Sequence, residues 1–167
     1  MIIFDKQKIE IYSNLQNIMK IEDFIDEICD YFNVHNDYFG NILVAVTEAV
    51  NNAIIHGNKL DESKKVSVIF EAKDGNLTFT VLDQGYGFDY KTIPDPTDPA
   101  SDGIAGRGLY LMNHLSDEIE FNDKGNGVKL KFAITSINNN IASRRIEEFN
   151  KYVDEQKVEE KKDKKIE

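Results

Sequence analysis

Two polar residues, Glu48 and Asn52, lie four positions apart in a segment whose apolar residues recur at helical spacing. Residues four apart share one helix face, so both side chains are expected to point the same way. A carboxylate on a largely apolar helix is costly to bury without partners, and there it can serve as a general base. An amide oxygen can join the shell of Mg²⁺, which takes few protein oxygens besides phosphates and water. A solvated polar stripe on a surface helix explains the same pattern equally well.

The segment Asp83-Gln-Gly-Tyr-Gly87 follows a predicted strand. A carboxylate at that place can accept a hydrogen bond from an exocyclic amino group such as that of adenine. Gly85 and Gly87 allow a sharp turn and the close approach of a flat ring. Taken alone, however, this segment is more simply interpreted as an ordinary Asp-x-Gly turn.

A third segment, Gly103 to Leu109, closes a proline-containing loop and opens a predicted helix with Gly106, Arg107, Gly108 and Leu109. Free amides and the positive end of a helix dipole form a phosphate-binding site. The glycine spacing is superficially that of a dinucleotide fingerprint, but no strand precedes it and no βαβ unit surrounds it. The alternative is a flexible linker with a glycine-rich helix entry.

The elements that must position these residues follow from hydrophobic periodicity. Helices are predicted at 14–33, 37–56 and 107–115, and strands at 2–12, 64–73, 76–83, 117–123 and 127–135. Ser13 or Asn14 is expected to cap the first helix, and Asn36 or Asp37 the second. Asp74-Gly75, between two strand-like runs, is the strongest short signal for a hairpin. The long segment 84–106 contains all three prolines and is expected to be a mobile loop.

This order predicts an α+β fold, a two-layer sandwich in which helices cover one face of a mixed, mainly antiparallel sheet. One domain is expected over residues 1–137. Residues 138–167 are expected to form a weak helix and a charged, partly disordered tail.

The amino-acid composition argues against several kinds of partner and site. The 167 residues carry a formal net charge of -10, which disfavours binding to nucleic acid phosphates and anionic membranes. The single cysteine, Cys29, excludes an intramolecular disulfide and a cysteine zinc cluster, and its apolar neighbours indicate a buried structural thiol. The N-terminus is charged too early for a signal peptide and no membrane span is expected, so the predicted location is the cytoplasm.

Together, the three segments resemble the nucleotide-binding boxes of the GHKL ATPase superfamily, whose fold is also called the Bergerat fold. The stretch from Glu48 to Gly57 is most similar to the bacterial anti-sigma-factor serine kinases. The resemblance implies Mg²⁺ and ATP as cofactors, a sigma factor and an anti-anti-sigma protein as partners, and a homodimer. The implied reaction passes the γ-phosphate of ATP to a serine of the anti-anti-sigma protein.

The resemblance also implies the role of each motif. Glu48 matches the catalytic base and Asn52 the Mg²⁺ ligand, while Asp83 matches the adenine-binding acid beside Gly85 and Gly87. The phosphate-side box matches the residues Gly106, Arg107, Gly108 and Leu109.

The sequence departs from the family pattern in two places. Gly103 and Ile104 stand where many relatives carry an arginine for the γ-phosphate, and Val128 stands where the last box has a threonine. Phosphoryl transfer depends on charge neutralisation. A nucleotide-gated binding module without kinase activity is therefore the alternative function. A detached histidine-kinase domain is disfavoured, because no phosphoacceptor hairpin is predicted.

Overall fold

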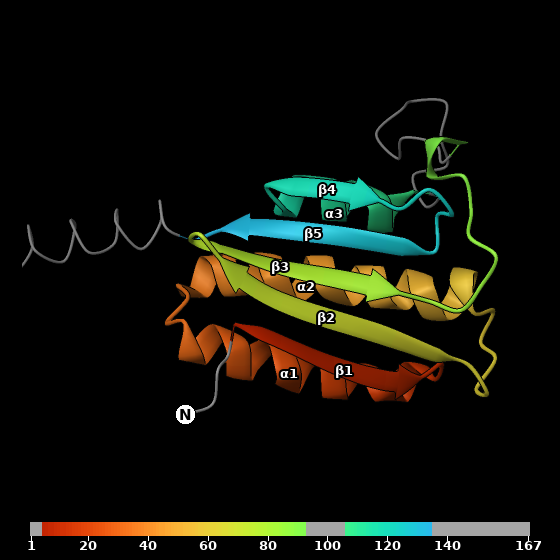
Figure 1. Ribbon diagram of the computed structural model, residues 1–167, viewed down its shortest axis with the longest axis horizontal. Helices are drawn as coiled ribbons and strands as arrows, with labels where there is room; N and C mark the ends of the chain where they lie inside the picture. Colours follow the sequence, from red (N-terminus) through yellow and green to blue (C-terminus); the bar gives the residue numbers. More distant parts are fainter. Residues whose placement is uncertain (1–4, 93–105, 135–167) are drawn as a thin grey trace, which may run out of the picture. The chain divides into compact units, whose positions relative to one another are not determined.

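The computed structural model describes residues 5–92 and 106–134, which contain one five-stranded sheet (Figure 1). The strands are β1 (Lys6–Tyr12), β2 (Lys65–Lys73), β3 (Asn76–Leu82), β4 (Glu118–Phe121) and β5 (Gly127–Ala133). They lie in the order β1-β2-β3-β5-β4, and each neighbouring pair is antiparallel. The predicted antiparallel character is confirmed, and no parallel pair occurs among the described strands.

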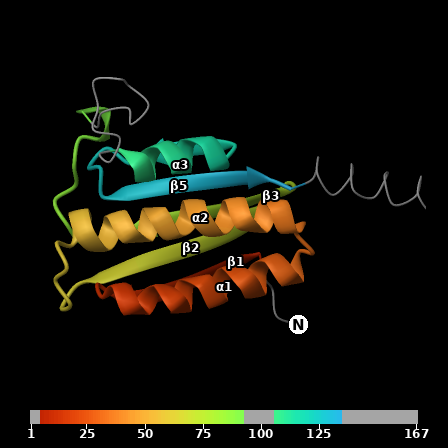
Figure 2. The ribbon, with the colours of Figure 1, turned by 180° about the vertical axis from the view of Figure 1, so that it is seen from behind.

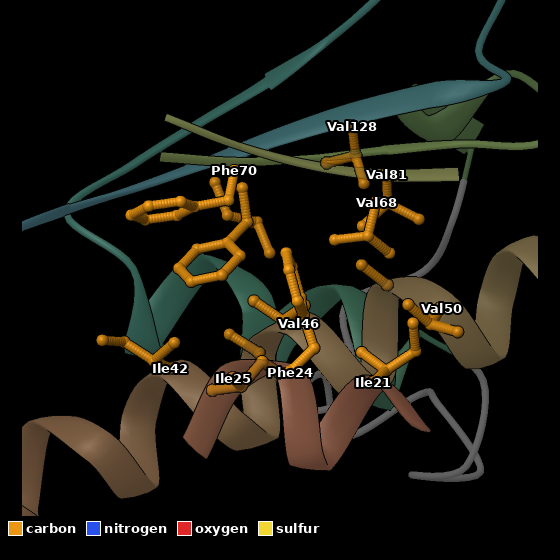
Figure 3. Close-up of a cluster of buried hydrophobic side chains, with 14 of the residues drawn as sticks. Ile21, Phe24, Ile25, Ile42, Val46, Val50, Val68, Phe70, Val81 and Val128 are labelled. Atoms are coloured by element: carbon orange, nitrogen blue, oxygen red, sulfur yellow. The ribbon is translucent and has the colours of Figure 1, made fainter. Parts of the chain in front are cut away.

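Three α-helices lie together on one face of this sheet: α1 (Ile18–Tyr31), α2 (Asn36–Asn52) and α3 (Arg107–Leu115), with α2 in the middle (Figures 1 and 2). The predicted α+β sandwich is therefore confirmed. Alternate residues of the central strands face the helices, as the period of two demands, so that Val68, Phe70 and Val81 are buried. Figure 3 shows them packed against apolar side chains of α1 and α2.

The hairpin between β2 and β3 forms at the predicted dipeptide. Lys73 pairs with Asn76, which leaves Asp74 and Gly75 as the two loop residues. Both have positive φ angles, 51° and 75°. A turn with two positive φ angles matches the twist of two antiparallel strands, and Asp-Gly is among the few dipeptides that adopt these angles at low cost.

Two helix starts differ from the predictions. Asn14 does act as a cap, but of a short 3₁₀ turn (Leu15–Asn17), and α1 begins only at Ile18. The predicted caps of α2, Asn36 and Asp37, are wrong, because both residues already belong to the helix. The cap is His35, whose extended backbone lets Nδ1 accept a hydrogen bond from the Asp37 amide at 3.3 Å.

The predicted helix 37–56 changes its winding before it ends. After Asn52 the chain continues as a π-turn, Ala53–Gly57, closed by a hydrogen bond of 2.8 Å from the Asn58 amide to the Ala53 carbonyl. Such turns are frequent at functional sites. By length and composition alone, Asn36–Gly57 could cross a membrane. Its apolar residues pack beneath the sheet, as expected for a core helix.

The compact unit that contains the described residues ends at Ile134. The loop region 93–105 and the predicted C-terminal segment 138–167 lie outside the described residues.

Candidate functional site

Three segments remote in the sequence lie together at one end of the strands. The C-terminal ends of α2 and β3 lie at the same end of the sandwich as the turn between β4 and β5 (Figure 1). The pocket at this end has an apolar wall, formed by Ala49, Ala53, Val81, Phe88, Met112, Phe121 and Val128. Its side-chain polar groups come from Asn52, Asp83 and Asn126. An apolar pocket with a few convergent polar groups is typical of a small-molecule site.

Asp83 is the carboxylate of this pocket. It is half-buried, and the Gly85 amide donates a hydrogen bond of 2.7 Å to Oδ1. Burial raises the pKa of the Asp83 carboxyl above its ordinary value, while the Gly85 hydrogen bond and the charge of Lys64 act in the opposite direction. No described residue donates a hydrogen bond to the other carboxylate oxygen, Oδ2.

Two glycines make room for this carboxylate. A methyl group added at Gly57 would overlap the Asp83 carboxyl group, and one added at Gly85 would overlap the Gly57 carbonyl. The end of α2 and the turn after β3 therefore lie in direct contact. Gly85 was predicted as a turn glycine, but its contact with Gly57 depends on the packing of α2 and was not foreseen.

The turn after β3 also interlocks with the β4–β5 turn. Gly87 has a φ of +83°, and a side chain there would overlap the Lys124 carbonyl. Across the same contact, the Phe88 amide donates to the Gly125 carbonyl at 3.4 Å. Phe88 consequently faces the pocket, with its ring 6.4 Å from that of Phe121. Tyr86, by contrast, is fully exposed.

Glu48 and Asn52 lie opposite the start of α3. A methyl group added at Gly108 would lie 2.9 Å from Glu48 Oε2 and 3.3 Å from Asn52 Nδ2. The structure thus brings the predicted helix pair and the predicted glycine box together. No described side chain forms an ion pair or hydrogen bond with the Glu48 carboxylate.

At the start of α3, three backbone amides make no hydrogen bond to the described residues. Gly106 precedes the helix with a φ of +79°, and the first hydrogen bond of the helix runs from the Tyr110 amide to the Gly106 carbonyl. The amides of Arg107, Gly108 and Leu109 therefore have no partner within the helix. The Arg107 side chain is exposed, while Leu109 packs on the core.

A metal ion would find few protein ligands at this site. The described residues contain no cluster of three or more His, Cys, Asp or Glu side chains able to hold a metal. The Asn52 amide oxygen can serve as a single ligand, and Mg²⁺ commonly takes one or two from protein when phosphates supply others.

The histidines have structural positions. His35 caps α2, and His114 stacks on Tyr110 with ring centroids 3.9 Å apart. His56 lies exposed in the last turn before Gly57. None of the three lines the pocket.

Comparison with known proteins agrees with this geometry. The family model of the histidine kinase-like ATPase domain matches residues 11–132. The chain therefore belongs to this family of ATPase domains, and members of such a family use ATP.

The chain is also similar to individual proteins with assigned names. The chain is 38% identical over 92 residues to the serine-protein kinase RsbW of Bacillus licheniformis, a match covering 50% of this chain and 56% of that one. It is 30% identical over 117 residues to an anti-sigma F factor of Clostridium perfringens, covering 68% of this chain and 76% of the relative. The match thus spans little more than half the length of the RsbW relative.

A solved structure has the same fold. It contains the RsbU and RsbW domains of a Mycobacterium tuberculosis protein, with a TM-score of 0.54 and 18% identity, covering 76% of this chain and 31% of that chain.

Proposed function

We propose that this chain is an ATP-dependent anti-sigma factor that binds an RNA polymerase sigma factor and phosphorylates a serine of an anti-anti-sigma protein. The observation that carries the proposal is the convergence of Glu48 and Asn52 with Gly108 beside the pocket that contains Asp83. The resemblance to proteins named serine-protein kinase and anti-sigma F factor supports it.

The pocket suits the adenine end of ATP. The free oxygen of Asp83 would accept a hydrogen bond from the 6-amino group, while Gly85 and Gly87 would let the ring approach the turn. The amides of Gly106, Arg107, Gly108 and Leu109, together with the positive end of α3, would hold phosphate oxygens.

The proposed reaction uses Glu48 as a general base. Its carboxylate would accept the proton of a serine hydroxyl as the hydroxyl oxygen forms its bond to the γ-phosphorus and the bond to the ADP oxygen breaks. Asn52 would hold Mg²⁺, which supplies charge neutralisation on the phosphates when bound.

The kinase proposal can be tested with labelled ATP, Mg²⁺ and an anti-anti-sigma protein from the same cell. We expect transfer to serine by the wild type and a loss of at least a hundredfold in Glu48→Gln, since general-base catalysis contributes roughly 10²–10⁴-fold. Glu22→Gln, an equivalent change on the exposed face of α1, serves as the control. Wild-type transfer by Glu48→Gln would rule out the assigned role.

A non-enzymatic, nucleotide-gated binding module is the second candidate. Val128 favours it, because this residue lines the pocket where the related box carries a threonine. The second departure, Gly103 and Ile104, lies outside the described residues. Tight ATP binding and sigma-factor capture without serine phosphorylation would favour this module over the kinase.

The proposed partners are proteins. We propose a homodimer that acts in the cytoplasm, where the sigma factor would be available. The formal charge of -10 favours basic protein surfaces over nucleic acid. Sedimentation with and without ATP, followed by mixing with the cell's sigma factors, would test the dimer and the sigma-factor contact.

A further inference from the structure

Asn58 is a fully buried polar residue directly after the π-turn of α2. Its Nδ2 group donates to Ser13 Oγ at 2.7 Å and to the Lys65 carbonyl at 3.0 Å. Its Oδ1 atom accepts from the Gln84 amide at 2.8 Å. The Asn58 side chain thus joins three segments of the chain. Ser13 directly follows β1, Lys65 is the first residue of β2, and Gln84 lies just after β3.

The contact with Gln84 affects the proposed adenine-binding site, because Gln84 directly follows Asp83 in the chain. On the other side, the Asp83 amide donates to the Asn126 carbonyl at 2.9 Å, and Asn126 Nδ2 donates to the Asp83 carbonyl at 3.2 Å. The backbone around Asp83 is therefore held from two directions. Asn126 lines the pocket, whereas Asn58 does not.

The position of this backbone decides where the carboxylate points. The Asp83 carboxyl group lies against Gly57, and Gly85 lies against the Gly57 carbonyl, without room for a methyl group at either glycine. Asn58 follows Gly57 in the chain and bonds the residue after Asp83, so it clamps both sides of this contact.

We propose that Asn58 is a positioning residue that aims the Asp83 carboxylate and thereby sets the preference of the site for a 6-aminopurine. This inference rests on the proposed ATP-binding function. Asn58 would touch neither the nucleotide nor the reacting atoms. Its effect is transmitted through the Gln84 amide on one side and through its chain neighbour Gly57 on the other.

The chain offers a matched control. Ser13→Ala removes a hydrogen-bond partner of Asn58 on the side away from Asp83 and leaves the bond to Gln84 in place. A purely structural role of the buried network predicts similar effects of Asn58→Ala and Ser13→Ala. A positioning role predicts that only Asn58→Ala changes base selectivity.

The test measures dissociation constants for ATP and for purine riboside triphosphate, which lacks the 6-amino group. In the wild type, a hydrogen bond to a charged acceptor should favour ATP by roughly tenfold to a hundredfold. We expect this ratio to approach one in Asn58→Ala and to stay unchanged in Ser13→Ala. An unchanged ratio in Asn58→Ala would overturn the proposal. If Asn58→Ala does not fold, Asn58→Ser, whose hydroxyl is polar but too short to replace the bond to Gln84, takes its place with the same expected ratio.

Hydrogen exchange of the nucleotide-free protein separates this inference from the proposed function. We expect the Gln84 amide to exchange at least tenfold faster in Asn58→Ala, with little change for amides in the middle of β2 and β3. Failure of the wild type to bind ATP would refute the proposed function, and the exchange at Gln84 would still decide whether Asn58 holds the turn. Unaltered protection of Gln84 would show that it does not.

Discussion

Replacing Gly108 with alanine should separate catalysis from folding. The added methyl group would lie 2.9 Å from Glu48 Oε2 and 3.3 Å from Asn52 Nδ2. Carbon and oxygen atoms prefer separations of about 3.5 Å or more, so the carboxylate must move by roughly 0.5–1 Å. Because both contacts are the ends of flexible side chains, the backbone can remain in place. Alanine in a helix also favours folding by about 0.5–1 kcal/mol over glycine.

The consequence for phosphoryl transfer should be large. A displacement of about 1 Å in a catalytic group can cost on the order of 100-fold in rate, so we expect a decrease of roughly 10- to 100-fold in transfer to serine. ATP binding measured in EDTA should change little, because the substitution keeps the backbone amide of residue 108 and lies away from Asp83, whereas the gain in affinity on adding Mg²⁺ should fall. Far-UV circular dichroism and thermal unfolding would confirm that the fold is kept.

Gly40→Ala is the matched control for this substitution. It is the same chemical change in α2, where an added methyl group meets nothing within 4 Å. We expect it to stabilise the protein by about 0.5–1 kcal/mol and to leave transfer unchanged. Wild-type rates in Gly108→Ala, with the same stability gain as Gly40→Ala, would refute the view that α3 positions Glu48 and Asn52 for catalysis.

Three further predictions follow from buried groups. Burial raises the pKa of Asp83 in the folded state, so its ionisation opposes folding at neutral pH. Asp83→Asn should therefore increase the free energy of unfolding at pH 7, as measured by denaturant titration. This gain should disappear as the pH falls through the pKa of Asp83 in the folded state. The same substitution should lower the affinity for ATP. Val128→Thr should strengthen ATP binding by about fivefold, the value of one hydrogen bond near 1 kcal/mol, whereas Val68→Thr in the core should only destabilise the fold. Burial, aided by the charges of Asp26 and Asp30, raises the pKa of Cys29 to about 12, so a disulfide reagent should label this thiol only as fast as the protein unfolds.

Local chemistry made several elements predictable. The Asp74-Gly75 hairpin depends on two backbone angles that this dipeptide adopts at low cost, so no knowledge of the rest of the fold is needed. The helix at 107–115 was predicted with its observed bounds, because Gly106 supplies the left-handed residue before it. The cap of α2 was missed because His35 is an uncommon capping residue, and its neighbours Asn36 and Asp37 are common ones.

The remaining features of the site arise from tertiary contacts. The sequence predicts no role for Asn58 or Asn126, because asparagine in a loop usually indicates only a turn. Their importance appears when β3 pairs with β5, which places Asn126 against Asp83, and when the end of α2 packs on the same turn. Phe88 could be placed near the Asp83 turn, but its orientation into the pocket required the interlocking of Gly87 with the β4–β5 turn.

The distribution of carboxylates links the fold to the proposed chemistry. On the sheet face away from the helices, acidic residues of β2 and β4 pair with lysines, as in Glu71 with Lys6 at 2.7 Å and Glu118 with Lys131 at 2.9 Å. These contacts lower the pKa of Glu71 and Glu118, so both are weaker bases than usual. At the site the pattern is reversed, since burial raises the pKa of Asp83 and Glu48 has no described cationic partner. A lysine beside Glu48 would ease the cost of its partial burial, yet it would also weaken the carboxylate as a proton acceptor. The ion pairs Glu71–Lys6 and Glu118–Lys131 therefore lie on the sheet face opposite the carboxylates that are proposed to bind and react.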